Sequence, residues 1–422
     1  MCMKRMLMLL ILFLPMCLMA NEKGYQSQVL SPRVKSLQVH LASDWQKAPV
    51  IEMGSDQQVT VSFDEMSHEY LRLAYRVLHC NADWTPSGMN ELEYLEGFSE
   101  NDLPEGNSSE ATTVEYTHYS FSLPNEQVQL KLSGNYVLEV FDRDAEEDEA
   151  LLLRACFSLL DRKVGLDAKV SAQTDQAYND KFQQVFIEVQ TPMGLISRPE
   201  SDVTIMIRQN RRVDNQVLGV PLYMSTGNTL HYKHQPALVF EAGNEYRRFE
   251  ISSHKLPGMG VDRLDFQRPH YHAFLFADQP RLSGYTYDED QNGRFYIRNR
   301  EADFLQSDYQ VVHFCLPASK PFDKPLYLLG DFVQANMPQV LPLQYNEEAG
   351  AYEMELLLKQ GLYNYCYALG HLSENALPSE GYCVGAIEGD YWPTKNEYQI
   401  FVYYRPFGGQ YDELIGYGEV TN

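Results

Sequence analysis

No apolar run in this sequence is long enough to cross a membrane as a helix. The first one, Met6–Leu14, falls well short of the roughly 20 residues that a transmembrane helix needs, and no later stretch reaches that length. Clusters of Lys and Arg are also missing: 34 basic residues stand against 58 acidic ones, and the net charge is −24. Binding to DNA or RNA depends on such clusters to neutralise phosphates. We therefore expect a chain that neither spans a membrane nor binds nucleic acid.

Cysteine is scarce, and the 7 cysteines lack the paired Cys-x-x-Cys spacing of a structural zinc site. They are also too sparse for a small disulfide-stapled scaffold. Cys366 and Cys383 lie close enough in sequence to pair across neighbouring strands, although buried free thiols on strands are the simpler interpretation. The sequence leaves the state of these two thiols open.

The common catalytic and nucleotide-binding motifs are absent. The sequence contains no Gly-x-Ser-x-Gly, no His-Glu-x-x-His, no P-loop and no Gly-x-Gly-x-x-Gly. Some of the 58 acidic residues must lie near one another, as the paired carboxylates of glycosidases do, but nothing singles out two of them. We expect no catalytic residue, no cofactor and no enzymatic activity.

Residues 1–20 have the composition of a secretory signal peptide. Lys4 and Arg5 precede the apolar run, and a small Ala20 stands before a polar stretch. We expect this segment to be removed and the remainder to be exported. In an alternative interpretation Cys17 is lipidated, but Met16 is bulkier than the small residue expected before such a cysteine.

Strand signals recur along the whole chain. Val59–Phe63 and Leu71–Val77 alternate apolar and polar residues, and many later segments of similar length are rich in β-branched and aromatic residues between turn residues. These later segments are 136–141, 151–159, 185–189, 203–207, 247–251, 273–276, 311–316, 326–329, 352–358, 363–369 and 398–404. Helical periodicity is short and rare. The pattern predicts an all-β protein built of tandem immunoglobulin-like or early-set β-sandwich domains.

Two linker-like segments divide the chain. Asp161–Lys163 follows a predicted strand, and a proline-rich stretch begins at Pro317. We predict three sandwiches over residues 25–162, 163–317 and 318–418.

Two of these units contain a Gly-x-Tyr strand start, at Gly134 and at Gly361. Such a tyrosine is typical of immunoglobulin-like sandwiches, where its hydroxyl bonds to an upstream backbone group. Leu326–Phe332 in the third unit also resembles the early-set sandwiches that accompany starch-active enzymes. The glycan-binding members use exposed Trp residues, and here Val333 follows without a Trp. An exported glycan-binding or glycan-processing protein is therefore an alternative function.

The hexapeptide from His79 to Trp84 is the most distinctive motif. Adjacent His79 and Cys80 might suggest a nucleophile with its base or two metal ligands, yet successive strand residues face opposite sides of a sheet. We favour a strand end in which Asn81 and Asp83 form turn hydrogen bonds and Trp84 covers the core.

A half-complete calcium loop follows later in the chain. Asp288, Asp290 and Asn292 place oxygens at the first, third and fifth positions, but the twelfth position is Asn299 rather than Glu. The favoured interpretation is a hairpin whose flanking strands meet at the Asn292-Gly293 turn. Calcium binding is the alternative.

Two histidines form another candidate metal site. His270 and His272 lie on one face of a predicted strand, as a pair of zinc ligands would. No third ligand can be assigned, and we favour surface or partly packed histidines.

Taken together, the motifs resemble one family along almost the whole chain. They are His79–Trp84, Glu93–Phe98, Tyr116–Tyr119, Gln209-Asn210-Arg211, Asp288–Gly293, Leu358-Lys359-Gln360-Gly361 and Tyr403-Tyr404-Arg405. In this order they resemble the plug protein of the type IX secretion system, long known only as a domain of unknown function.

The resemblance implies a periplasmic, non-enzymatic protein. Such plugs are associated with the periplasmic mouth of a very large outer-membrane translocon barrel, which they would close while no substrate passes. The family offers no catalytic residue to carry over to this sequence. Its motif residues are expected to act mainly as folding determinants.

Overall fold

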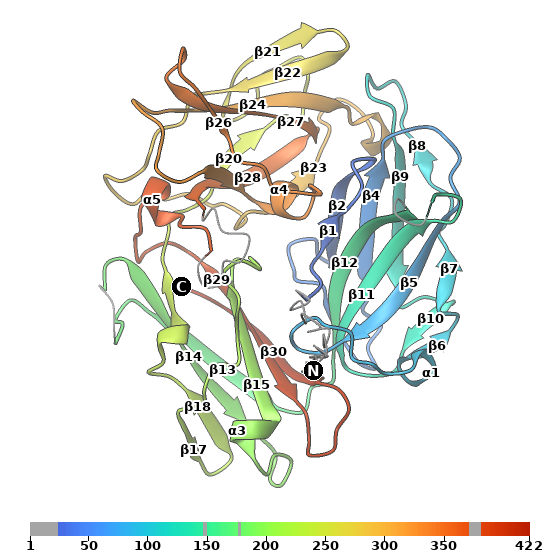
Figure 1. Ribbon diagram of the computed structural model, residues 1–422, viewed down its shortest axis with the longest axis vertical. Helices are drawn as coiled ribbons and strands as arrows, with labels where there is room; N and C mark the ends of the chain where they lie inside the picture. The colour runs from blue at the N-terminus through green and yellow to red at the C-terminus, as the bar shows by residue number, and fades with distance from the viewer. Residues whose placement is uncertain (1–23, 147–149, 176–178, 371–380) are drawn as a thin grey trace, which may run out of the picture.

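The computed structural model describes residues 24–146, 150–175, 179–370 and 381–422. Within them the chain forms seven sheets, which pack as three β-sandwiches (Figure 1), so the predicted all-β sandwich fold is confirmed. The predicted signal peptide, including Cys17, lies outside the described residues. No helix among the described residues is long and apolar enough to cross a membrane. The helical segments are α1 Glu91–Tyr94, α3 Pro199–Asp202, η1 Pro236–Leu238, η2 Phe304–Gln306, α4 Asp331–Gln334 and α5 Gly385–Glu388.

The first sandwich is built from the N-terminal third of the chain. One sheet consists of β1 (Gln28–Val29), β12 (Leu151–Leu160), β11 (Gly134–Asp142), β5 (Leu73–Cys80) and β7 (Glu100–Asp102), with β3 (Val50–Glu52) beside β12. The other consists of β2 (Val34–Leu41), β4 (Val59–Glu65), β9 (Thr117–Leu123) and β8 (Asn107–Ser108), and β10 (Val128–Leu130) pairs with β6 (Leu95–Gly97). Their alternating apolar residues form one buried core.

The second sandwich combines strands from two distant parts of the chain. One sheet contains β13 (Gly165–Ser171), β14 (Phe182–Gln190), β18 (Thr229–Tyr232) and β17 (Met224–Thr226), with β19 (Val239–Glu241) on β14. The other contains β16 (Val217–Leu218), β15 (Val203–Gln209), β29 (Glu397–Tyr404) and β30 (Glu413–Thr421). In Figure 1 the red C-terminal strands therefore lie against the green ones.

The third sandwich lies between β19 and β29 in the sequence. One sheet contains β20 (Arg247–Glu250), β28 (Gly361–Leu369) and β23 (Phe295–Ile297), with β25 (Leu326–Leu329) also on β28. The other contains β21 (Val261–Gln267), β22 (His270–Leu275), β24 (Tyr309–Pro317), β27 (Ala351–Lys359) and β26 (Gln344–Asn346). Phe249, Phe314 and Tyr363 are part of its aromatic core.

The predicted division at residue 317 is wrong. β24 ends at Pro317 and pairs with β27 in one continuous antiparallel ladder, so both belong to the same sandwich. β29 and β30 complete the core of the second sandwich. The third sandwich is thus an insertion into the second, and the proline-rich stretch is a loop between its strands.

Both Gly-x-Tyr strand starts make the hydrogen bond typical of a corner tyrosine. The Tyr136 hydroxyl donates to the carbonyl of Leu132 over 2.6 Å. The Tyr363 hydroxyl likewise donates to the carbonyl of Lys359. Each tyrosine thereby ties the start of a central strand to the preceding turn, which explains why the motif occurs in two sandwiches.

Candidate functional site

Motif residues from opposite ends of the sequence meet where the first two sandwiches touch. Arg405 donates from Nη2 to Asn81 Oδ1 over 2.8 Å and from Nε to Asp412 Oδ1 over 2.8 Å. Asp412 Oδ2 in turn accepts the backbone N–H of Ala82 at 3.0 Å. The bonds of Arg405 to Asn81 and of Asp412 to Ala82 cross the boundary between the sandwiches. They fix the end of β5 against the loop after β29.

Asn135 is the buried centre of this first junction. Its Oδ1 accepts hydrogen bonds from the Tyr403 hydroxyl at 3.0 Å and the Ser158 hydroxyl at 2.8 Å. Its Nδ2 donates to the carbonyl of Asn81 at 3.0 Å. Asn135 is fully buried, so an unpaired amide there would be costly. Tyr404, the neighbour of Tyr403, donates to the carbonyl of Leu195 within the second sandwich at 3.0 Å.

His79 and Cys80 point away from each other. His79 packs edge-on against Tyr136 and Tyr411, and burial lowers its pKa to about 4. Cys80 lies in an apolar cluster with Trp84, where burial raises its pKa. Neither a nucleophile–base pair nor a shared metal site results.

The rest of the hexapeptide forms the turn that follows β5. Asp83 Oδ1 accepts the backbone N–H of Thr85 at 3.0 Å, and Trp84 N–H donates to the carbonyl of Asn81. Trp84 has a left-handed backbone with φ of 63° and is 7% exposed. These are the bonds of a structural turn.

Gln209 and Asn210 lie within the second sandwich, near the points where the third sandwich is inserted. Gln209 Nε2 donates to the carbonyl of Glu241 at 2.9 Å. Asn210 Oδ1 accepts the backbone N–H of Glu397 at 2.9 Å. Next to them, the Glu397 carboxylate binds Arg211 at 3.1 Å and Arg294 of the third sandwich at 2.6 Å. The ion pair between Glu397 and Arg294 therefore links this group of residues to the inserted sandwich.

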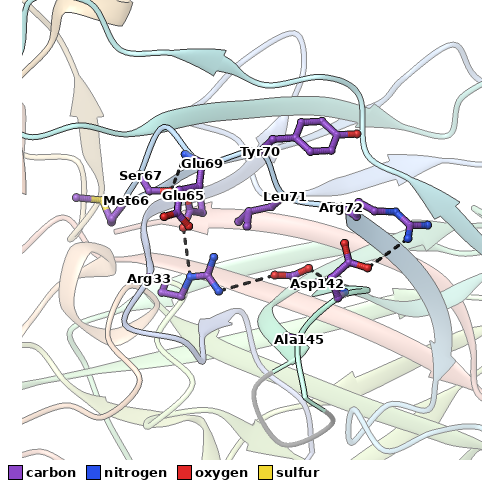
Figure 2. Close-up of a pocket in the computed structure, with 11 residues that line it drawn as sticks. Arg33, Glu65, Met66, Ser67, Glu69, Tyr70, Leu71, Arg72, Asp142 and Ala145 are labelled. Atoms are coloured by element: carbon purple, nitrogen blue, oxygen red, sulfur yellow. Dashed lines mark hydrogen bonds and ion pairs between the residues drawn. The ribbon is translucent and has the colours of Figure 1, made fainter.

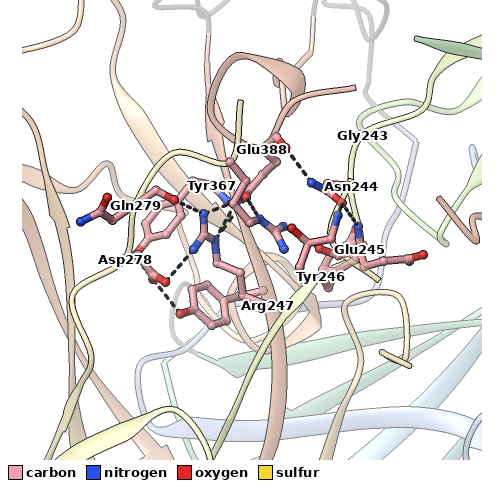
Figure 3. A network of polar contacts seen from close by, with 12 residues as sticks. Gly243, Asn244, Glu245, Tyr246, Arg247, Asp278, Gln279, Tyr367 and Glu388 are labelled. Atoms are coloured by element: carbon pink, nitrogen blue, oxygen red, sulfur yellow. Dashed lines mark hydrogen bonds and ion pairs between the residues drawn. The ribbon is translucent and has the colours of Figure 1, made fainter. Parts of the chain in front are cut away.

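A second link at this insertion is a buried polar network (Figure 3). Glu388, which is fully buried, accepts hydrogen bonds from Arg247 and Arg281, and Arg247 also binds Asp278 at 2.7 Å. Asn244 donates to the carbonyl of Glu388 at 3.0 Å. The network thus joins the segment that enters the third sandwich to the segment that leaves it. No short motif marks it, because its members are spread over more than a hundred positions.

The first and third sandwiches meet at a buried ion pair. Lys359 Nζ lies 2.7 Å from Asp64 Oδ2, and the Tyr309 hydroxyl donates to the same oxygen at 2.7 Å. His118 Nδ1 lies 2.7 Å from the other oxygen, Oδ1. Burial raises the pKa of Asp64, but Lys359 and His118 outweigh it and the pKa lies below its usual value. Lys359 belongs to the same sequence motif as Gly361, so a motif of the third sandwich supplies one partner of this ion pair.

The two aspartates of the candidate calcium loop bind other groups of the protein. Asp288 forms an ion pair with Arg248, and both oxygens of Asp290 accept backbone N–H groups, from Tyr246 and from Asn292. Burial raises the pKa of Asp290 to about 7. The expected hairpin is wrong: the turn at Asn292 is present, but β23 after it pairs with β28.

His272 pairs with His313 and not with His270, the partner predicted from the sequence. His272 Nδ1 lies 2.8 Å from His313 Nε2 on the adjacent strand β24, and His313 Nδ1 lies 3.2 Å from Glu355 Oε1. Burial lowers the pKa of His313. Within the described ranges no group of three or more His, Cys, Asp or Glu side chains is arranged to hold a metal ion.

All five cysteines from Cys80 onward are free thiols. Cys383 does lie on a bridge to the strand that carries Cys366, but its partner there is Leu369. The thiols of Cys366 and Cys383 are consequently unpaired, in agreement with the simpler interpretation of the sequence.

A hollow of about 450 Å³ opens on the surface of the first sandwich (Figure 2). At its base Arg33 lies between Glu65, at 3.3 Å, and Asp142, at 3.8 Å. Tyr70, 87% exposed, stands at the rim. The two buried carboxylates, Glu65 and Asp142, are both paired with Arg33.

Comparison with known proteins identifies a family and a similar structure. Residues 34–161 match the family described as the first domain of the type 9 secretion system plug protein. Among curated proteins, none matches the chain. A crystal structure of a hypothetical protein from Parabacteroides merdae is 38% identical, with a TM-score of 0.90 over 94% of this chain and 100% of that one. The chain belongs to the plug protein family of the type IX secretion system.

Proposed function

We propose that the protein is a non-enzymatic periplasmic plug that binds and occludes the outer-membrane translocon barrel of the type IX secretion system. The family match of the first sandwich supports a role in this system. The observation that carries the proposal is that several motif residues make contacts across the sandwich junctions, among them Asn81 with Arg405 and Lys359 with Asp64. Such contacts would hold the three sandwiches in fixed relative positions, as a stopper requires.

Rigidity follows from the chemistry of the junctions. Inter-domain contacts usually permit relative motion unless they are large or strongly specific. Here a buried ion pair, Asp64 with Lys359, and a buried amide, Asn135, lie between the sandwiches. Opening the junctions would break the Lys359–Asp64 ion pair and the Tyr403–Asn135 hydrogen bond. Each group that stays buried without its partner costs about 1–3 kcal/mol if neutral and more if charged.

The third sandwich does not favour the glycan-binding alternative. In early-set glycan-binding modules an exposed aromatic side chain binds the sugar. Here Phe332 is 3% exposed and Val333 is 1% exposed, and both belong to the core. The residues after β25 therefore pack in the core of the third sandwich and do not form an exposed sugar-binding surface.

The direct test is deletion of the gene in its host. We expect outer-membrane leakage of a periplasmic marker in the deletion strain, and co-purification of the tagged protein with the translocon barrel from the complemented strain. An intact barrier together with no co-purification would refute the proposal. Specific binding on a glycan array without co-purification would favour the glycan-binding alternative.

A double variant tests whether the junction between the first two sandwiches matters for function. Arg405→Ala combined with Tyr403→Phe removes two hydrogen bonds across the junction, Arg405 to Asn81 and Tyr403 to Asn135, and also the Arg405–Asp412 bond within the loop after β29. We expect a folded protein that complements the deletion incompletely. Arg72→Ala is the matched control, because its partner Asp144 is exposed and belongs to the same sandwich.

A further inference from the structure

The outer face of the third sandwich carries a close pair of imidazoles. β22 and β24 are parallel neighbours, with His272 opposite Val311 and Phe274 opposite His313. The residues that alternate with the histidines, Ala273 and Val312, are fully buried in the core. His272 and His313 therefore project from the other side of the sheet, diagonally adjacent to each other.

The geometry of the pair defines its chemistry. His272 Nδ1 and His313 Nε2 are 2.8 Å apart, so one proton at most lies between them. His313 Nδ1 lies 3.2 Å from Glu355 Oε1. The shared proton belongs to one of the two facing nitrogens, and the other accepts it. When that proton leaves, both nitrogens are free to bind an ion, which at about 2.0 Å from each nitrogen lies beside the line that joins them.

We propose that His272 and His313 form a two-imidazole site for a borderline divalent transition metal, such as Zn²⁺ or Cu²⁺, which replaces the shared proton and joins β22 to β24. Imidazole nitrogen suits these ions, whereas Ca²⁺ and Mg²⁺ prefer oxygen ligands. Water completes the coordination. The proposal is independent of the plug function.

The surroundings orient the second ligand. Glu355 on His313 Nδ1 is the carboxylate that commonly fixes the tautomer of a metal-binding histidine. Phe274 stacks on the His313 ring at 4.0 Å with an interplanar angle of 11°, and Arg263 covers the other side of Phe274 at 3.8 Å. The imidazole plane is thereby held before any ion arrives.

The local charge favours a cation. Asp265 lies opposite His272 in the strand register, and Glu353 and Glu355 project from β27 next to β24. Arg263 is the opposing positive charge on this part of the sheet. Three carboxylates against one guanidinium leave the face acidic.

A bound ion would change the mechanics of the fold. β21 and β22 form a hairpin that projects at one end of the molecule (Figure 1). A metal bridge to β24 would add a link between the hairpin and the centre of the sheet. Binding to the folded state alone raises the unfolding temperature, and above the Kd the stabilisation grows with the logarithm of the free ion concentration.

The test is calorimetric titration of the untagged full-length protein with Zn²⁺ and, separately, Cu²⁺. We expect one equivalent of each ion to bind, Cu²⁺ more tightly, and to raise the unfolding temperature. His272→Ala and His313→Ala should each abolish that equivalent and the temperature shift. His231→Ala is the matched control, because His231 also lies 3.2 Å from a carboxylate, that of Glu188, and has no second imidazole bonded to it in the described structure.

Other outcomes are equally decisive. Cys315 follows His313 by two positions on the same strand, so Cys315→Ser tests whether its thiol contributes, and we expect no effect. Circular dichroism establishes that each variant is folded. Absence of binding in the unmodified protein, or full binding in the His272→Ala/His313→Ala double variant, would overturn the proposal.

Discussion

Asp64 and Lys359 are 295 positions apart in the sequence, yet their side chains form an ion pair of 2.7 Å between the first and third sandwiches. Neither side chain is more than 1% exposed. The ammonium group also lies 3.9 Å from the centre of the Tyr116 ring and 4.4 Å from that of Phe304. A charge so placed is stable only while the two sandwiches keep their relative position.

Loss of one partner should therefore be severe. Lys359→Met leaves the Asp64 carboxylate buried without its cation, and we expect a loss of about 3–5 kcal/mol in the free energy of unfolding. Denaturant unfolding followed by fluorescence measures it, with both sandwiches monitored because the transition need not be two-state.

Two variants calibrate this prediction. Arg72→Ala breaks an exposed pair with Asp144 and should cost no more than about 1 kcal/mol. The double variant Asp64→Leu/Lys359→Met removes both charges and should recover part of the loss. Equal losses from Lys359→Met and Arg72→Ala would contradict the role given to the buried pair.

Acid should weaken the junction between the first two sandwiches through His79. Its neutral ring accepts the Ser87 hydroxyl at Nδ1, at 2.9 Å, and donates from Nε2 to the carbonyl of Ser133, at 3.2 Å. Burial lowers the pKa of His79 to about 4. Its contribution to stability is thus complete above about pH 6.5, the ordinary pKa of histidine, and is lost as the pH falls towards 4, by about 3 kcal/mol.

His79→Gln removes the titrating group and keeps a donor and an acceptor. The difference in stability between the native protein and this variant should shrink steadily as the pH falls from neutral. Other groups cancel in that difference. A difference that does not change with pH would show that His79 does not titrate in this range.

Gly97 should tolerate no side chain. Its φ is +116°, and a Cβ atom would lie 1.9 Å from the carbonyl oxygen of Gln127 on the paired strand. Gly97→Ala should cost about 3 kcal/mol or more, from backbone strain and the clash together. Gly88→Ala is matched in backbone conformation, with φ of +73° and nothing near the added atom, and should cost about 1–2 kcal/mol. Thermal unfolding compares them, and equal losses would remove the clash as the cause.

Excess Ca²⁺ should leave the unfolding temperature unchanged. The Asp288 carboxylate binds Arg248, and both oxygens of Asp290 accept backbone N–H groups, so neither side chain offers a free oxygen. Scans with Ca²⁺ and with EDTA test this. A calcium-dependent rise that disappears in Asp290→Asn would restore the calcium loop, and Arg248→Ala tests whether the arginine is what excludes the ion.

Local patterns in the sequence are sufficient to predict single strands and turns, but not how the strands pair. The alternation in Val59–Phe63 identified a strand because one face of it is buried. The turn at Asn292-Gly293 was also identified correctly, since both residues have positive φ. Its strand partners were not, because β23 pairs with β28, and no short-range signal encodes that choice.

Long-range pairing explains the remaining differences. His272 was grouped with His270, its neighbour on the strand, whereas its bonded partner is His313 on the next strand. The junction residues were found as motifs without their geometry: nothing in the sequence says that Arg405 reaches Asn81. The Glu388 network had no signal at all, since its charged members are scattered along the chain and isolated charged residues usually face solvent.

The insertion of the third sandwich into the second has a consequence for biogenesis. β13 and β15 are synthesised early, but the sheet that contains β15 and covers the sheet of β13 is completed only by β29 and β30, the last strands to emerge. Half of the second sandwich must therefore wait, with its apolar face uncovered, until the whole inserted sandwich has been made. During synthesis the first sandwich can fold as soon as it is complete, whereas the other two reach their final form almost together. The three sandwiches can therefore assemble into one body only after the last strand has been made.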